Sequence, residues 1–348
     1  MFMRYVLLAL ISIVIIDLLI FSFLLIKKVA KNVVKKRKVK IKNKYDELFL
    51  HLIMETDQSM TIKPKTHMEK KVLHELVLHY NTVLSGDAKK RLLDHIDKSF
   101  IAVRINRYLR SKSVWKNKIG TFLVGEYELN DMLPVLLKQL KTSDYELLFV
   151  TARSIIVVSN DQYIKDILQV VTKREKMTKQ NVLTLIDLVE ADIEAILDEA
   201  MMEGNGFLKM IALEELGKRN YIKSIHWIKH MLTQPEKEFR IAALKASYSI
   251  GDIGDESYLQ GMYLLQTDPE WEVRAFLAKF LMKVKRDSAI DILTNLMSDS
   301  NWYVRHNASN ALLAQGEKGK LVLMDLLNSE DAFARDTAHA VLQRDILL

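Results

Sequence analysis

Two histidines beside a glutamate come closest, in residue type and order, to a metal-dependent catalyst in this chain. The segment His74-Glu75-Leu76-Val77-Leu78-His79 resembles the order of a zinc-protease motif, which needs two histidines one helical turn apart. That motif has a four-residue spacing, whereas the spacing here is five residues. At about 100° per residue, the two imidazoles would point about 140° apart on a helix. The segment therefore predicts an ordinary helix and no zinc site.

A second pair, His226 and His230, does have the four-residue spacing. No third ligand stands nearby, and Lys229 between the two histidines would repel a cation. The chain has no cysteine, which excludes disulfides, thiolate zinc sites and cysteine nucleophiles. His-Glu pairs at regular intervals would indicate a di-iron hydroxylase, but only one such pair occurs. We therefore expect no catalytic residue, no metal and no cofactor, and predict that the protein is not an enzyme.

Arginines recur at a nearly fixed interval in the last third of the chain, each after an apolar residue and before small or apolar ones. They are Arg240, Arg274, Arg305 and Arg335, which stand 34, 31 and 30 residues apart. Such a period is typical of stacked helical repeats. We expect each arginine to open the first helix of a unit, near the acidic residues of the preceding loop, Asp268, Asp299 and Asp331. Hydrogen bonds from these arginines to loop carboxylates and carbonyls would lock one unit to the next.

The rest of the chain supports an all-helical architecture. Glycine and proline are scarce, at 11 and 4 residues, and strand-like alternation is rare. Followed backward, the arginine period predicts about eight helix pairs over residues 113–348. Residues 45–112 do not fit the period and are predicted to form a helical adaptor that caps the array.

The N-terminal residues 1–26 predict a transmembrane anchor. Tyr5 to Ile26 is an apolar run of 22 residues whose one charged residue is Asp17. Ten basic residues follow in the juxtamembrane segment 27–44, and the positive-inside rule places them in the cytoplasm. The sequence thus predicts a single-pass inner-membrane protein with its N-terminus outside and its C-terminal domain in the cytoplasm. Asp17 would either meet a polar group on another membrane helix or stay as a tolerated, protonated side chain.

Charge is distributed unevenly along the chain. Segment 27–44 is expected to act as a topology signal and to bind anionic lipid headgroups. Residues 86–120 carry a net charge of +7, whereas residues 121–348 carry −8. Arg104, Arg107 and Arg110 share one helical stripe within the basic segment. They form either a solvated face or a basic patch for headgroups or an acidic partner, with nucleic acid as the weakest alternative.

The repeats resemble a known family. Trp302-Tyr303-Val304-Arg305, followed by Ala308 and Ala311-Leu312, is similar to the HEAT-like repeat of the phycobilin-lyase type. With the anchor, the basic flank and the adaptor, the chain resembles bacterial membrane-anchored HEAT-repeat proteins. The resemblance implies an all-α fold: a right-handed α-solenoid of HEAT-like helix pairs, preceded by one transmembrane helix. Some members are linked to membrane glycosyltransferases and polysaccharide export, so a partner of that class is implied.

These observations favour a membrane-tethered scaffold for protein–protein interaction. Its partner surface is expected on the concave wall, assigned here to the second helices of the units. The predicted contact residues are Glu194, Asp198, His226, Lys229, His230, Gln260, Tyr263, Asp291, Asn295 and Asp325. Two alternatives stay open: a lyase-like enzyme with a site in the concave groove, and a nucleic-acid-binding HEAT protein.

Overall fold

The computed structural model describes residues 2–54, 61–160, 162–190 and 192–347, and for residues 2–14 and 345–347 it describes the backbone alone. The prediction of an all-helical protein is confirmed. Over the described residues the regular structure is helical, and one isolated parallel bridge joins Ile62 to Ile96. The chain forms two compact units, Met1–Leu136 and Leu137–Leu348. The division falls within the stretch predicted to hold the first repeat.

The first unit contains one long helix and several short ones. Its helices are α1 (Phe2–Met54), α2 (His67–Asn81), α3 (Gly86–Asp94), α4 (Ser99–Leu109), α5 (Val114–Glu126) and the 3-10 turn η1 (Asn130–Met132). Helix α6 (Leu133–Gln139) crosses the division.

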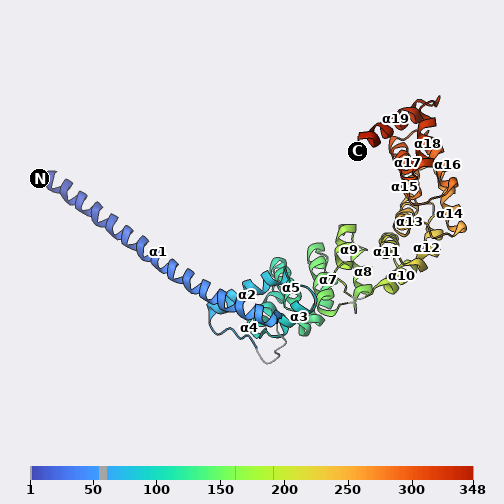
Figure 1. Cartoon of the computed structure of the whole chain (residues 1–348). Coiled ribbons are helices and arrows are strands. Elements are labelled where there is room, and N and C mark those ends of the chain that lie inside the picture. Colours follow the sequence, from blue (N-terminus) through green and yellow to red (C-terminus); the bar gives the residue numbers. More distant parts are fainter. Residues whose placement is uncertain (1, 55–60, 161, 191, 348) are drawn as a thin grey trace. The chain divides into compact units, whose positions relative to one another are not determined.

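Among the described side chains of α1, those of its last part are packed on the short helices of the unit. Tyr45, Phe49 and Leu52 recur at helical spacing and are buried against α2 and α3. The ring of Phe49 meets that of Tyr80 edge to face, with the centroids 5.0 Å apart. This apolar stripe fixes the end of α1, while the preceding turns extend away from the short helices (Figure 1).

The predicted transmembrane anchor is wrong. Within the described residues, no helix is both long enough and apolar enough to cross a membrane. The part of the anchor before Ile15 lies outside the described side chains. From Ile15 onward the apolar run ends at Ile26, and lysines follow directly. A span of about 20 residues starting at Ile15 would therefore contain Asp17 and three lysines. The predicted inner-membrane localisation is therefore wrong as well. The side chain of Asp17 is exposed, and its contact with another membrane helix stays a prediction.

The second unit is a row of helix pairs. The first helices are α7 (Tyr145–Ser159), α9 (Lys179–Ile186), α11 (Gly206–Lys218), α13 (Lys237–Ile250), α15 (Trp271–Leu281), α17 (Trp302–Ala314) and α19 (Ala332–Leu347). The second helices are α8 (Ile164–Val171), α10 (Glu194–Glu203), α12 (Ile225–Met231), α14 (Glu256–Tyr263), α16 (Asp287–Leu296) and α18 (Glu317–Leu326). Short 3-10 turns, η2 (Ile222–Ser224) and η3 (Leu264–Thr267), precede α12 and follow α14.

Polar residues in the loops set where these helices begin. Asp144 caps α7 by accepting the backbone N–H of Leu147, and Asn205 caps α11 in the same way. Asn301 accepts the N–H of Tyr303 at the start of α17. A short side-chain acceptor satisfies one of the backbone donors that a helix start leaves without an intrahelical partner. These caps fix where α7, α11 and α17 begin and thus the direction of the side chains that follow.

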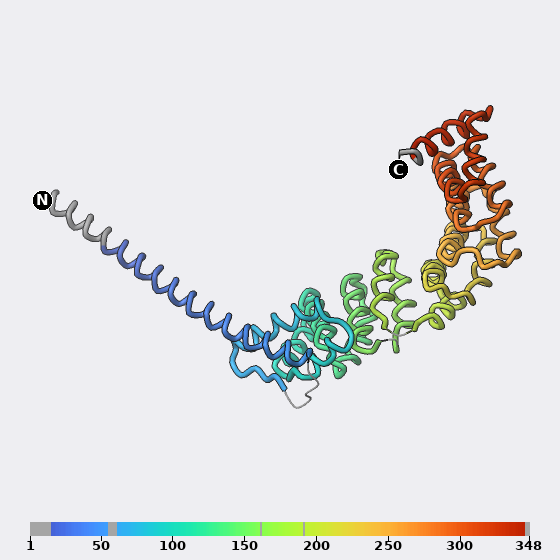
Figure 2. Tube along the Cα trace, in the orientation of Figure 1, coloured from blue at the N-terminus to red at the C-terminus, as the bar shows by residue number. Residues whose placement is uncertain are grey.

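Consecutive first helices pack closely, and this closeness bends the row. Helices α11, α13, α15 and α17 each contact the next first helix extensively, whereas the second helices touch one another little. A Cβ at Gly217 would lie 2.6 Å from Ala246 Cα, so α11 and α13 meet at backbone distance. When neighbouring helices are closer together on one side of a row than on the other, the row curves toward the side with the closer spacing. In Figure 1 the first helices of this unit accordingly lie inside the bend, and the tube in Figure 2 follows the same course.

Candidate functional site

Two of the repeated arginines, Arg240 and Arg274, join neighbouring units through largely buried ion pairs. Arg240 donates from Nε and Nη2 to the two carboxylate oxygens of Asp268, at 2.7 and 3.0 Å. Its Nη1 donates to the carbonyls of Gln234 and Pro235, at 2.8 and 2.7 Å. The two charged side chains are 9% and 5% exposed. The Arg240 guanidinium therefore binds the carbonyls of the loop before it and the carboxylate of the loop after it.

Arg274 repeats this geometry one unit later. Its Nε and Nη2 donate to Asp299 at 2.6 and 2.9 Å, and its Nη1 donates to the carbonyl of Asp268 at 2.7 Å. Burial raises the pKa of Asp299, but bonds from Arg274 and the backbone of Asn301 outweigh it, so that the pKa lies below its ordinary value. The expectation that the acidic partner belongs to the preceding loop needs correction. That loop supplies carbonyl oxygens, because the guanidinium reaches across to the following unit for its carboxylate.

The last two arginines make only half of these contacts. Arg305 donates from Nη1 to the carbonyls of Asp299 and Ser300, at 2.7 and 3.0 Å. Arg335 donates from Nη1 to the carbonyl of Ser329 at 2.8 Å. Neither pairs with a carboxylate among the described residues.

The ten residues predicted to line a concave wall lie on or beside the second helices, which form the outer row of the bend (Figure 1). Their placement on the inner wall therefore needs correction, and their role in partner binding stays a prediction. Exposed among them are His226, His230, Gln260, Asp291, Asn295 and Asp325.

The other four are partly or largely covered, and three have partners within the array. Asp198 accepts the indole N–H of Trp227 at 2.8 Å. Lys229 lies 3.0 Å from Asp255, whose pKa is held at about 2 by the hydroxyl of Ser257 and by Lys229. Tyr263 is buried and accepts from Ser288, and Glu194 is half-buried.

A groove runs instead along the first helices. One cavity of about 230 Å³ is lined by α11, α13 and α15, and a second of about 630 Å³ is lined by α15, its C-terminal end and α17. Phe276 and Lys279 line both cavities, so the two are adjacent. We call this surface the lysine groove. Its lining residues are Glu214, Lys218, Lys245, Tyr248, Ser249, Phe276, Lys279, Met282, Asn307, Asn310, Leu313 and Ala314.

Lysines in and beside the groove lie over aromatic rings. The Nζ atoms of Lys279 and Lys283 lie 5.1 and 5.3 Å from the centre of the Tyr248 ring. Lys245 lies 4.9 Å from the ring of Phe276. Each contact contributes about 0.5–1 kcal/mol at an exposed site and holds the ammonium group in place.

Carboxylates neutralise only part of this charge. Lys218 pairs with Glu215, and Lys245 lies 3.7 Å from Glu214. Lys279 and Lys283 have no carboxylate within ion-pair distance among the described residues, although they share one ring. The groove therefore presents Lys279, and beside it Lys283, at the ring of Tyr248 without carboxylate partners.

Sequence reasoning missed this site. The net charge of −8 over residues 121–348 suggested an acidic surface, because a sum over a long segment does not resolve one face. The sequence nevertheless contains a spacing that could have indicated this site. Lys279 and Lys283 stand four residues apart, and Tyr248 stands one repeat, 31 residues, before Lys279. Side chains one repeat apart lie side by side when first helices stack in register.

The other predicted groups are not among the residues that line the groove. Arg104 and Arg107 are exposed on α4, and Arg110 is exposed at its C-terminal cap; Arg104 lies over the ring of Tyr108. His74 is half-buried, and its Nδ1 lies 2.7 Å from the Tyr127 hydroxyl. His226 bonds to its own helix start through the carbonyl of Lys223. Within the described residues, no group of three or more histidine, aspartate or glutamate side chains is arranged to hold a metal.

Comparisons with known proteins agree with the repeat architecture. Residues 262–343 match the family described as HEAT repeats. A comparison with curated proteins gave no match. Among solved structures, one engineered protein is 17% identical with a TM-score of 0.36, over 61% of this chain and 97% of its own. A second engineered protein is 16% identical with a TM-score of 0.37, over 87% and 90% of the two chains. Human deoxyhypusine hydroxylase in complex with glycerol is 10% identical with a TM-score of 0.29, over 89% and 98%.

The family match covers η3 and the helices from α15 to α18, together with parts of α14 and α19. These are the units in which Arg274 and Arg305 recur with tightly packed first helices. Residues 262–343 of this chain therefore resemble HEAT repeats both in sequence and in their arrangement as helix pairs.

Proposed function

We propose that this protein is a non-catalytic scaffold whose lysine groove binds an acidic segment of a partner protein. HEAT repeats offer a long continuous surface, and here that surface carries two lysines without carboxylate partners over one tyrosine ring. A carboxylate placed between Lys279 and Lys283 would relieve their mutual repulsion. This pair of lysines on Tyr248 is the observation that carries the proposal.

A peptide suits the groove better than a nucleic acid. Nucleic-acid-binding proteins commonly neutralise about 6–10 phosphates. Lys245 and Lys218 already have carboxylate neighbours, which leaves two lysines for an incoming ligand. The groove floor also includes Phe276, Met282 and Leu313, which favour apolar side chains next to the acidic ones. A short segment that mixes acidic and apolar residues matches these features.

The family resemblance adds a candidate for the partner. The resemblance implies an envelope glycosyltransferase as the partner, and the groove would bind an acidic segment of such a protein. The lyase-like alternative is less well supported, because Glu214 is engaged with Lys179 and Lys245 rather than placed to exchange protons with a ligand.

Peptide selection tests the proposal without a known partner. Random twelve-residue peptides are selected on the full-length chain and on a Lys279→Gln/Lys283→Gln variant. We expect aspartate and glutamate to be enriched on the parent chain alone. The best peptide should bind the variant at least about tenfold more weakly, the effect of losing one hydrogen bond to a charged group.

A matched control separates the groove from general charge. Lys173→Gln/Lys223→Gln removes the same two charges at exposed positions outside the groove and should leave peptide affinity unchanged. Equal weakening in both variants, or selection of peptides without acidic residues, would refute the proposal. Stronger binding of a single-stranded oligonucleotide than of the peptide would favour the nucleic-acid alternative instead.

A further inference from the structure

The guanidinium of Arg305 binds backbone carbonyls in the same way as those of Arg240 and Arg274, but it has no aspartate partner. In all three arginines, Nη1 donates to the carbonyls five and six residues earlier. In Arg240 and Arg274, Nε then donates to an aspartate of the next loop. The Nε of Arg305 is buried and has no hydrogen-bond partner among the described residues, and Arg305 is 8% exposed.

The cause is one residue, Ser329. Asp268 and Asp299 each accept the backbone N–H two residues later, and each offers its carbonyl to the next arginine. Ser329 does both: its hydroxyl accepts the N–H of Asp331 at 3.2 Å, and its carbonyl accepts from Arg335. Serine therefore stands in the last unit where the two earlier units have the aspartate that binds the guanidinium.

Asp331 does not replace the missing carboxylate. One of its oxygens caps α19 by accepting from Phe333 and Ala334. The pKa of Asp331 lies below its ordinary value, chiefly because of a hydrogen bond from the Ser298 hydroxyl, with Arg305 as a minor contributor. One of its oxygens is thus engaged at the start of α19, and no hydrogen bond joins Asp331 to the Nε of Arg305 among the described residues.

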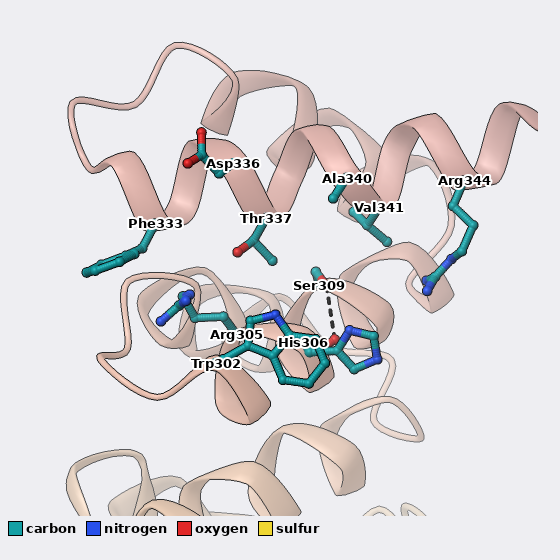
Figure 3. A pocket seen from close by; sticks show the side chains of 10 residues that line it. All are labelled: Trp302, Arg305, His306, Ser309, Phe333, Asp336, Thr337, Ala340, Val341 and Arg344. Atoms are coloured by element: carbon teal, nitrogen blue, oxygen red, sulfur yellow. Dashed lines mark hydrogen bonds between the residues drawn. The ribbon is translucent and has the colours of Figure 1, made fainter.

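A cavity of about 260 Å³ lies beside Arg305, between α17 and α19. Figure 3 shows the ring of Phe333 on one side of the guanidinium and Trp302 on the other, with Thr337 facing them from α19. The Phe333 ring centre is 4.5 Å from the guanidinium carbon. Ligand pockets usually start at about 300 Å³, so the space suits a small ligand or a single side chain.

The charges around the cavity favour an anion. Arg305 and Arg344 both line it, and Arg344 is held by the side chain of Asn310. The one carboxylate of the lining, Asp336, extends away from Arg305 and Trp302 in Figure 3. His306 stacks on Trp302, with the rings 4.8 Å apart, and closes the lower side.

We propose that this cavity binds a carboxylate, which engages Nε of Arg305 as Asp268 engages Arg240 and Asp299 engages Arg274. The carboxylate belongs to a small free acid or to an acidic side chain, and the aromatic rings beside Arg305 select ligands with an apolar part. The site is independent of the lysine groove, so either proposal can fail without the other.

The test follows the Nε–H signal of Arg305 by ¹⁵N NMR in the full-length protein, with the signal assigned from its absence in Arg305→Lys. Phenylacetate serves as the free acid, and the blocked peptide acetyl-Gly-Phe-Asp-Gly-amide serves as the acidic side chain. Phenylacetamide and the peptide with asparagine in place of aspartate are the neutral controls. We expect the two acids to shift the signal and the two amides to leave it in place. The acid with the lower Kd identifies the source of the carboxylate.

Ser329→Asp supplies the carboxylate from within the chain, and Ser329→Asn is its neutral match. The aspartate should weaken binding of both acids at least about tenfold, the effect of losing one hydrogen bond to a charged group, whereas the asparagine should not. Should Ser329→Asp fail to fold, Arg305→Lys gives the same comparison by calorimetry, because it keeps the charge and removes the Nε–H. An unchanged Arg305 signal with both acids, or equal affinity in parent and variant, overturns the proposal.

Discussion

The buried pair of Arg240 and Asp268 offers the sharpest test of how the units hold together. Asp268→Asn keeps the size of the side chain and the oxygen that accepts the N–H of Glu270. It removes the negative charge opposite a guanidinium whose side chain is 9% exposed. Removal of one member of a buried pair costs about 3–5 kcal/mol, because the other charge stays desolvated without its partner. We expect about 3 kcal/mol, the lower end, because the amide oxygen still accepts one hydrogen bond.

The assay is thermal and urea unfolding of the full-length chain, followed by circular dichroism. For a unit of 150–250 residues, 1 kcal/mol shifts Tm by about 2–4 °C, so the second unit should melt about 6–12 °C lower. Because each repeat contacts only its neighbours, hydrogen exchange should rise most in α13 and α15.

Asp287→Asn is the matched control. Asp287 and Lys318 lie 2.6 Å apart, but their side chains are 77% and 70% exposed. An exposed pair contributes little, since water solvates both charges once the pair is broken. Equal losses of stability in the two variants would refute the argument that burial makes the Arg240 pair important. A loss below 1 kcal/mol for Asp268→Asn would refute it as well.

Two further predictions concern packing and pH. Gly217→Ala should destabilise the second unit by about 1–3 kcal/mol, because the new Cβ would lie 2.6 Å from Ala246 Cα. Gly261→Ala, whose Cβ would meet nothing closer than 3.8 Å, should instead stabilise α14 by about 0.5–1 kcal/mol, and urea unfolding of the two variants compares the signs. Burial lowers the pKa of His74 below 6.5, with Arg104 adding to the effect and Glu75 opposing it. The unfolded chain then takes up the proton first, so the first unit should lose stability as the pH falls below about 6.5. Urea unfolding at pH 7.5 and 5.5 should show this loss in the parent and in His79→Gln, but not in His74→Gln; an equal loss in all three would contradict the assignment.

Periodicity in the sequence determined the architecture of the array. Apolar-arginine starts about thirty residues apart predicted the first helices, and α13, α15, α17 and α19 begin where those starts stand. This succeeds because each unit contacts only its neighbours, so that a local pattern repeated along the chain specifies the fold. The same period predicted that the arginines join units through loop carboxylates and carbonyls.

The local sequence pattern was not sufficient to predict the character of the N-terminal helix or the position of the lysine groove. The apolar run before Lys27 indicated a membrane span, but the described part of α1 carries too many charges within the length that a span requires.

Only the tertiary structure decided which helices face inward. That choice depends on how closely neighbouring helices approach, and Gly217 against Ala246 brings the first helices, not the second, to the inner side. The placement of Lys279 and Lys283 on Tyr248 follows from this packing, whereas the missing carboxylate at Arg305 follows from Ser329, which packing places in the loop after that unit. The sequence contained all of these residues, but their contacts join different repeats, and the register between repeats is set by packing rather than by any one segment.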